Sequence, residues 1–271
     1  MIKGEKFLNP DRLPTIWCPG CGNGIVLHAA METLEEMGCT KKDVICISGI
    51  GCSSRSGTYT QFDQVHTLHG RAIPFATAIK LARPDKKVIV FTGDGDASAI
   101  GGNHLIHAAR RNIDITVIVF NNSIYGMTGG QVSPLTGSYK KGTTARFGNY
   151  ENRFDLVHLA IGAGATYVAR TGTYYYRHMK KYMEKGFSRK GFSLLEVVTQ
   201  CPVYYGRLNG TPDPYKMMME QKDMLVLQSK YDALSVEDQA SHLPMGEFIE
   251  DNQQLSYIEK REQLLKKVRE S

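Results

Sequence analysis

Two short polar segments have the residue types of a metal and phosphate site. They are Thr92–Asp96, with the sequence Thr-Gly-Asp-Gly-Asp, and Phe120–Thr128, which begins Phe-Asn-Asn. Each follows an apolar, strand-like run, so both would lie at the carboxyl ends of parallel strands, where open α/β sheets bind ligands. Magnesium prefers hard oxygen ligands and usually takes one or two protein carboxylates beside phosphate oxygens. Asp94 and Asn122 therefore predict a magnesium-diphosphate site at this edge of a sheet.

The chain between these segments has the length of one βαβ unit. Apolar runs predict strands over Lys87–Phe91 and Ile115–Phe120, and the stretch Ala97–Arg111 between them predicts a helix. The glycines beside Asp94 would let the backbone approach a phosphate, and the start of the helix would direct free N–H groups at it. Gly-Asp-Gly alone is more typical of a turn. Its combination with Asn-Asn one βαβ unit later favours the site.

Four of the six cysteines lie in loops that would meet at the same sheet edge. Two form a Cys-Pro-Gly-Cys knuckle and two follow the predicted strands Val44–Ser48 and Leu194–Thr199; the four are Cys18, Cys21, Cys52 and Cys201. Four thiolates hold either zinc or an iron-sulfur cluster, and spacing alone does not choose between them. The nearby diphosphate site favours a redox cluster. Cys39 and Cys46 are expected to be structural, because free cysteine commonly packs as a small apolar side chain.

Six segments of the chain, in their order along the sequence, resemble the β subunit of the 2-oxoacid:ferredoxin oxidoreductases, a thiamine diphosphate-dependent family. The resemblance extends from about Trp17 to Arg207 and, more loosely, to the end of the chain. The segments are Trp17–Gly24, Ile47–Arg55, Leu68–Pro74, Thr92–Asp96, Phe120–Gln131 and Cys201–Arg207. This resemblance implies an α/β fold, with a doubly wound, mostly parallel sheet of the thiamine diphosphate-binding (diphosphate-domain) type.

The resemblance also implies which residues form the site. The ligands of one 4Fe-4S cluster would be Cys18, Cys21, Cys52 and Cys201, and those of magnesium would be Asp94, Asn122 and the carbonyl of Ile124. The residues expected to line thiamine diphosphate are Ile50, Gly51, Cys52, Ser53, His69, Gly95, Asp96, Gly126 and Met127. For His69 an alternative stays open, since a histidine there could simply cap the helix that Pro74–Leu81 predicts.

The implied reaction is the oxidative decarboxylation of a 2-oxoacid with coenzyme A to an acyl-CoA and carbon dioxide, with electrons passing through the cluster to ferredoxin. The resemblance implies that this reaction is reversible, so that the enzyme could also act as a carboxylating synthase. The segments Thr128–Gln131 and Cys201–Arg207 look most like those of subunits acting on 2-oxoglutarate, which would give succinyl-CoA. Pyruvate and branched-chain 2-oxoacids remain alternatives. A non-catalytic zinc-binding scaffold is the alternative of a different class, but it would leave Asp94 and Asn122 without a role.

The resemblance implies a partner chain as well. In this family the glutamate that activates the cofactor resides on another domain, and 271 residues leave no room for a second domain of comparable size. We therefore expect an α subunit to supply it, in a heterodimer or a dimer of heterodimers, with the cofactor between the two subunits. No catalytic residue is assigned to this chain itself.

Residues 1–210 are predicted to form the thiamine diphosphate-binding domain with the cluster loops, and residues 211–271 an extension that contacts another subunit. The hydrophobic content of 42% permits a large core, and no apolar run approaches the ~20 residues that span a bilayer. A cytoplasmic protein is expected, with neither a membrane nor nucleic acid as partner. The net charge is +6, and basic runs at Lys180–Lys190 and Lys260–Arg269 either steer an acidic ferredoxin or are solvated helix faces.

Overall fold

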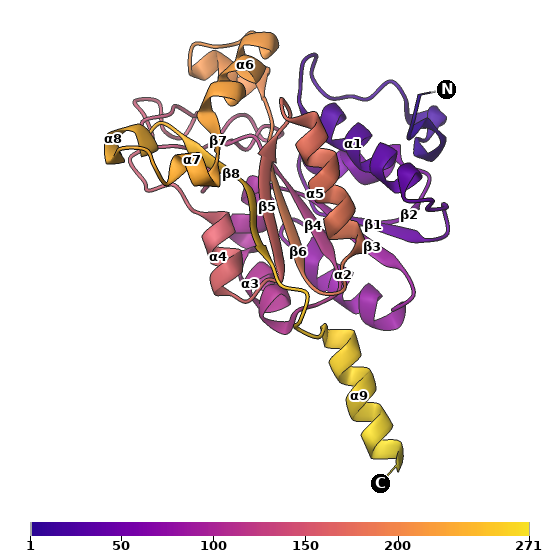
Figure 1. Cartoon of the computed structure of the whole chain (residues 1–271). Helices are drawn as coiled ribbons and strands as arrows, with labels where there is room; N and C mark the ends of the chain where they lie inside the picture. Colours follow the sequence, from indigo (N-terminus) through magenta and orange to yellow (C-terminus); the bar gives the residue numbers. More distant parts are fainter. Residues whose placement is uncertain (1, 271) are drawn as a thin grey trace.

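The computed structural model describes residues 2–270, and a single eight-stranded sheet lies at its centre (Figure 1). The strands are β1 (Val44–Ser48), β2 (Asp63–His66), β3 (Lys87–Gly93), β4 (Thr116–Asn121), β5 (Tyr167–Gly172), β6 (Ser193–Val198), β7 (Leu225–Leu227) and β8 (Leu243–Glu250). Their spatial order is β2-β1-β3-β4-β6-β5-β8-β7. The six strands from β2 to β5 in this order are parallel, and β8 runs antiparallel to β5. The predicted fold class is confirmed.

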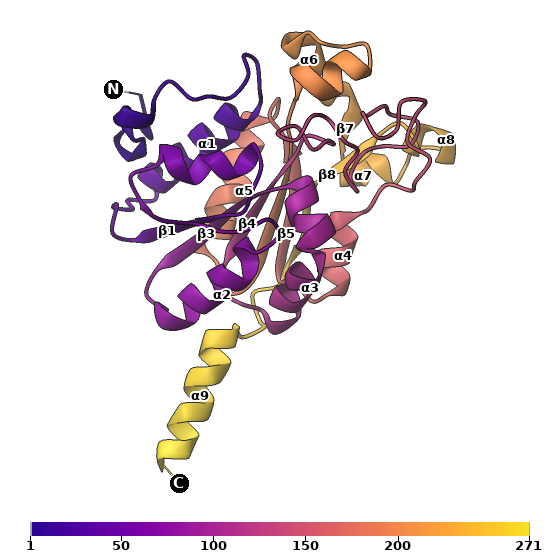
Figure 2. The ribbon, with the colours of Figure 1, turned by 180° about the vertical axis from the view of Figure 1, so that it is seen from behind.

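Helices cover both faces of the sheet. The helices are α1 (Asn23–Glu36), α2 (Ala72–Ala82), α3 (Gly102–Arg111), α4 (Leu156–Gly162), α5 (Tyr176–Ser188), α6 (Pro214–Met224), α7 (Gln228–Tyr231), α8 (Val236–Gln239) and α9 (Tyr257–Glu270). Helices α1 and α5 pack side by side on the face seen in Figure 1, whereas α2, α3 and α4 cover the face seen in Figure 2.

Alternating side chains of the central strands fill two separate cores. In β3, Ile89 and Phe91 belong to the core beneath α1 and α5, and Val88 and Val90 belong to the core beneath α2, α3 and α4. Successive side chains of a strand point to opposite faces, so a strand that is buried on both faces must be apolar throughout. This explains the uninterrupted apolar runs that predicted the strands.

The βαβ unit around Asp94 differs from its prediction at the start of its helix. The predicted helix 97–111 is divided into a π-helical turn, Asp96–Ile100, and α3, which begins only at Gly102. The N–H of Gly101 donates to the carbonyl of Asp96 at 3.1 Å, five residues back, which is the bond of a π turn. The strands β3 and β4 extend to Gly93 and Asn121, so both polar segments begin at the ends of their strands.

The chain after residue 210 is joined to the main sheet. Strand β8 pairs with β5 and strand β7 pairs with β8, so this part of the predicted extension continues the sheet that residues 44–198 begin. Helix α9 instead projects away from the body of the protein in both views, and Ile258 is its buried residue (Figures 1 and 2). Within residues 2–270 no helix is long and apolar enough to cross a membrane.

The first basic run forms a paired helix face. Lys180 lies 2.8 Å from Glu32 of α1, and Lys185 lies 2.6 Å from Glu247 and 2.8 Å from Glu250 of β8. Because acidic neighbours already offset these charges, the run favours the alternative of a solvated helix face over a surface that steers an acidic partner.

Candidate active site

One cavity of about 170 Å³ opens at the carboxyl ends of β1, β3 and β4. Every residue that was predicted to bind the cofactor or magnesium lines this cavity: Ile50, Gly51, Cys52, Ser53, His69, Asp94, Gly95, Asp96, Asn122, Ile124, Gly126 and Met127. The chain leaves β1 toward β2 on one side and continues from β3 to β4 on the other. The cavity therefore lies where the strand order reverses, the position at which doubly wound sheets bind ligands.

Asp94 is a buried carboxyl group, and no cationic side chain within residues 2–270 pairs with it. Its side chain is 3% exposed, and the hydroxyl of Ser133 donates to its Oδ2 atom at 2.5 Å. Burial raises the pKa of Asp94 to about 7, although the hydrogen bond from Ser133 opposes this shift. A divalent cation beside the carboxylate would favour its charged form. The donor type and the missing countercharge both fit a magnesium ligand.

The carboxylate of Asp96 is held by the protein itself. It accepts hydrogen bonds from the N–H of Gly70 at 2.5 Å and from the hydroxyl of Thr92 at 2.7 Å. His69 Nδ1 lies 2.7 Å from Asp96 Oδ1, and the imidazole stands edge-on to the ring of Tyr125. Asp96 therefore lines the cavity while fixing the loop that carries His69. The alternative role of His69 as a helix cap does not hold, because α2 begins at Ala72 with Arg71 at its N-cap.

The second polar segment forms a strained turn over residues 121–124, called the metal turn because it carries the predicted magnesium ligands Asn122 and Ile124. Ser123 has a φ of 58°, in the left-handed region that residues other than glycine rarely adopt. The side-chain oxygen of Asn121 accepts from both the N–H and the hydroxyl of Ser123, at 3.1 and 3.2 Å. The turn directs Asn122 and Ile124 into the cavity. Strained residues persist only where their surroundings hold them, and they gather at functional sites.

Two glycines of the site are required by close approaches. A Cβ atom on Gly95 would lie 2.1 Å from the ring of Tyr125, and one on Gly49 would lie 1.9 Å from the carboxylate of Asp96. Both contacts are far inside van der Waals distance. Gly95, the second glycine of Gly-Asp-Gly, thus makes room for the ring of Tyr125 at the cavity wall. The sequence did not suggest this role.

Three loops bring the four predicted cluster cysteines to the edge of this cavity. A Cβ on Gly126 would lie 3.4 Å from the sulfur of Cys52 and 3.9 Å from that of Cys201, so both thiols flank one residue of the cavity wall. The indole N–H of Trp17 donates to the carbonyl of Cys52 at 2.7 Å, which ties the loop of Cys18 and Cys21 to the same place. The N–H of Gly22 also reaches the carbonyl of Gln200 at 3.1 Å.

These four cysteines are free thiols: Cys18 is exposed, and Cys21, Cys52 and Cys201 are half-buried. Burial raises the pKa of Cys21 to about 12 and that of Cys52 to about 11, and the neighbouring thiols add to both shifts. Burial also raises the pKa of Cys201, against hydrogen bonds from the N–H groups of Tyr205 and Tyr204. Thiols with such raised pKa values become thiolates when a metal centre supplies positive charge. Cys39 and Cys46 are buried away from this group.

The four sulfurs do not converge on one point. In residues 2–270 no three His, Cys, Asp or Glu side chains are close enough together to hold a single metal ion. A mononuclear zinc site gathers four ligands tightly around one ion, whereas a cubane cluster spreads its four thiolates over separate iron atoms. The described residues 2–270 therefore contain no preformed site for a single metal ion held by three or more cysteines.

A buried charge network lies beneath the metal turn. Glu196, on β6, is fully buried and accepts from Arg170 at 2.8 Å and from the amide of Asn121 at 2.6 Å. Arg170 also donates to Asp155, whose carboxylate caps α4, at 3.1 Å. Through Asn121, this network connects the central sheet to the strained turn.

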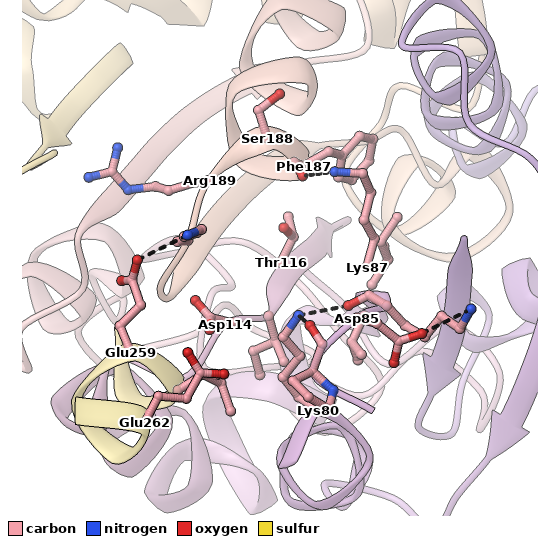
Figure 3. Close-up of a pocket in the computed structure, with 17 residues that line it drawn as sticks. Lys80, Asp85, Lys87, Asp114, Thr116, Phe187, Ser188, Arg189, Glu259 and Glu262 are labelled. Carbon is pink, nitrogen blue, oxygen red and sulfur yellow. Dashed lines mark hydrogen bonds and ion pairs between the residues drawn. The ribbon is translucent and has the colours of Figure 1, made fainter. Parts of the chain in front are cut away.

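A larger cavity of about 490 Å³ lies at the opposite edge of the sheet, where β3 and β4 begin (Figure 3). The first turn of α9 closes one side of it. Lys80 donates to the carbonyls of Pro84 and Lys86 at 3.0 and 2.7 Å, and Lys190 pairs with Glu259 at 3.1 Å. These polar groups have hydrogen-bond or ion-pair partners within the protein, and none of the predicted site residues lines this cavity. We therefore interpret it as the junction between the first turn of α9 and the body of the protein.

Sequence reasoning missed several residues of the site. Tyr125 lines the cavity beside Gly95, and Ser133 and Glu196 reach Asp94 and the metal turn from outside it. Tyr125 lies within the segment Phe120–Thr128 and could have been included. Ser133 opens the segment 133–149, whose Gly, Thr and Ser content predicts a long loop that could contact substrate or the partner subunit, but not a contact with Asp94. Glu196 interrupts an otherwise apolar strand, and this was the one available signal.

Comparison with known proteins agrees with this geometry. Residues 36–197 match the family model "Thiamine pyrophosphate enzyme, C-terminal TPP binding domain". The 2-oxoglutarate synthase subunit KorB of Methanocaldococcus jannaschii is 50% identical over 264 residues, 97% of each chain, and that of Archaeoglobus fulgidus is 52% identical over 198 residues, 73% of this chain and 74% of its own.

A solved structure also covers nearly the whole chain. It is the 2-oxoglutarate:ferredoxin oxidoreductase from Magnetococcus marinus with 2-oxoglutarate, coenzyme A and succinyl-CoA bound. Its sequence identity is 30% and its TM-score 0.85, over 98% of this chain and 90% of that one.

The fold, the cavity and the family model define a thiamine pyrophosphate enzyme domain. Within that class, the chain belongs to the family of the KorB subunits, the β subunits of 2-oxoglutarate:ferredoxin oxidoreductases. The family expected from the six sequence segments is thereby confirmed, and the alternative of a non-catalytic scaffold is set aside.

Proposed function

We propose that this chain, with an α subunit, oxidatively decarboxylates 2-oxoglutarate with coenzyme A to succinyl-CoA and carbon dioxide. The two electrons released would pass through a 4Fe-4S cluster to ferredoxin, and the same residues would serve the reverse, carboxylating direction. One observation carries this proposal: all the residues predicted to bind the cofactor and magnesium line the same cavity, and Cys52 is among them. The names of the KorB relatives support 2-oxoglutarate over pyruvate and branched-chain substrates.

In this proposal the residues around Asp94 hold the diphosphate end of the cofactor. The Asp94 carboxylate, the Asn122 amide oxygen and the Ile124 carbonyl would bind magnesium, which in turn would bind two phosphate oxygens. His69 would donate to a diphosphate oxygen. Thiamine diphosphate, once bound, supplies the carbon that adds to the keto group of the substrate.

Cys52 would connect the two halves of the chemistry. It lies between the residues assigned to the cofactor and the cysteines assigned to the cluster, and its sulfur is beside Gly126, a residue of the cavity wall. A cluster ligand at this place keeps the path for electron transfer short. The N–H groups of Tyr204 and Tyr205 would hydrogen-bond the ligand sulfur of Cys201, which raises the reduction potential of iron-sulfur clusters.

The α subunit would complete the cavity. None of the residues that line the cavity is a glutamate, and thiamine chemistry needs a carboxylate against the aminopyrimidine ring. The exposed side chains of Ile50 and Met127 at the mouth of the cavity fit coverage by a partner. We propose a heterodimer or a dimer of heterodimers, in which residues after 210 add to the contacts.

Substrate-dependent reduction of the cluster tests this proposal. The anaerobic complex with the α subunit is mixed with coenzyme A and either 2-oxoglutarate, pyruvate or a branched-chain 2-oxoacid, and the visible absorption and electron paramagnetic resonance of the cluster are recorded. We expect bleaching with 2-oxoglutarate and much slower bleaching with the others. Reduction by pyruvate alone would overturn the substrate, and reduction by none would overturn the reaction.

Replacing Cys201 with serine tests the cluster separately. We expect the Cys201→Ser complex to lose or degrade its iron while it retains thiamine diphosphate, because the thiol would be a cluster ligand and Cys201 does not line the cavity. Cys39→Ser is the matched control, since Cys39 is buried elsewhere. An intact, reducible cluster in Cys201→Ser would remove Cys201 from the ligand set.

A further inference from the structure

We propose that Ser133 and Thr136 are positioning residues that hold both halves of the magnesium site in place. This inference rests on the proposed function of the cavity. Neither residue lines the cavity. Their hydroxyl groups nevertheless contact the two polar segments that carry the proposed ligands, one segment each.

The first contact is made to Asp94. The hydroxyl of Ser133 donates to Asp94 Oδ2 at 2.5 Å, so one carboxylate oxygen is occupied and the rotation of the group is fixed. The carboxylate oxygen that binds a cation is thereby held in a fixed direction. Magnesium demands near-ideal octahedral geometry, so the direction of this oxygen decides how well it can bind.

The second contact is made to the metal turn. The hydroxyl of Thr136 donates to the carbonyl of Ser123 at 2.6 Å, and Ser123 is the residue with the left-handed backbone. Its carbonyl belongs to the peptide group that leads into Ile124, whose own carbonyl is a proposed magnesium ligand. Holding this peptide group stabilises a turn that would otherwise relax toward an ordinary conformation.

The two contacts are coupled and rigid. The N–H of Ser133 donates to the hydroxyl oxygen of Thr136 at 2.8 Å, and the N–H of Thr136 donates to the carbonyl of Ser133 at 3.0 Å. Pro134 restricts the backbone between them, and Leu135 is buried in the core beneath α2, α3 and α4. This Ser133–Thr136 turn is thus fixed to the body of the protein before any cofactor binds.

Burial makes these hydrogen bonds hard to replace. Ser133 is 4% exposed and Thr136 is not exposed at all, so water cannot take over a lost bond without a rearrangement. Removing one partner leaves a buried acceptor unsatisfied. The acceptors here are a carboxylate oxygen of Asp94 and the carbonyl of Ser123, and both belong to the proposed metal site.

The test uses Thr136→Val, which has nearly the same shape and no hydroxyl, and Ser133→Ala, both in the complete complex with the α subunit. Dissociation constants for Mg²⁺ and, separately, Ca²⁺ are measured at saturating thiamine diphosphate by titration calorimetry on cofactor-depleted complex. We expect each variant to weaken Mg²⁺ binding by about tenfold or more. Ca²⁺, which tolerates irregular geometry, should be weakened less, so that the ratio of the two constants changes.

Two controls separate positioning from general stability. Thr136→Ser keeps the hydroxyl and should restore Mg²⁺ binding. Thr116→Val removes another buried hydroxyl, which donates to the carbonyl of Gly186 at 2.8 Å far from the site, and should lower the melting temperature without changing either constant. Unchanged Mg²⁺ binding in Ser133→Ala and Thr136→Val overturns the inference. If Asp94→Ala also leaves binding unchanged, the proposed magnesium site itself is wrong, whereas loss in Asp94→Ala alone restricts the failure to the Ser133–Thr136 turn.

Discussion

Asp94→Ala in the complex with the α subunit should abolish the retention of thiamine diphosphate while the iron content persists. The substitution removes the only carboxylate in the proposed ligand set, and the amide of Asn122 with a carbonyl cannot offset the charge of a divalent cation. The four cysteines lie on other loops, so the proposed ligands of the cluster are unchanged. Cofactor content after gel filtration, by fluorescence of the oxidised thiamine, and iron content by colorimetry are the measurements.

Asp114→Ala provides a matched comparison for this substitution. Asp114 is also partly buried, with a pKa raised by burial, but it lines the cavity at the opposite edge of the sheet. We expect the Asp114→Ala complex to retain both cofactor and iron. Joint loss of cofactor and iron in Asp94→Ala would show that the two sites are not separable, and full retention of cofactor would exclude Asp94 as a ligand.

Glu196→Leu should be the most destabilising single change considered. It leaves the guanidinium of Arg170 buried without its main counter-ion, and breaking a buried pair in this way costs about 3–5 kcal/mol. In a domain of this size such a loss corresponds to a fall of roughly 10 °C in melting temperature. The measurement is the thermal unfolding of the complex, followed by circular dichroism and by calorimetry.

The double variant Glu196→Leu with Arg170→Met separates the lost pair from lost packing. If the cost arises from an unpaired charge, the double variant should be more stable than the sum of the single effects predicts. Lys190→Ala, which breaks the exposed pair with Glu259, should not measurably change the melting temperature. A double variant as unstable as the sum would assign the effect to packing alone.

The sequence was most informative where topology alone determines position. Residues at the carboxyl ends of neighbouring parallel strands must meet, so Asp94 and Asn122 could be brought together without any knowledge of side-chain contacts. The strands β1, β3, β4 and β6 could be located because burial on both faces requires continuous apolar runs. Loop positions had already grouped the four cysteines. The resemblance then supplied the cofactor and implied an iron-sulfur cluster, where spacing had left zinc and iron-sulfur both open.

The sequence was least informative where a contact joins distant segments. Ser133 reaches Asp94 across 39 positions, and nothing in its neighbourhood marks it as different from other loop serines. The antiparallel pairing of β8 with β5 likewise depends on which edge of the sheet is free. The π turn at Asp96 was missed because a helix pattern does not reveal a local change of hydrogen-bond register.

The most direct test of the central claim is metal and cofactor analysis of the complex purified without oxygen, together with whichever chain copurifies. We predict about four iron atoms per chain, as a cluster held by four cysteines requires, together with bound thiamine diphosphate, magnesium and an α subunit. Zinc in place of iron, with no thiamine diphosphate, would contradict the account.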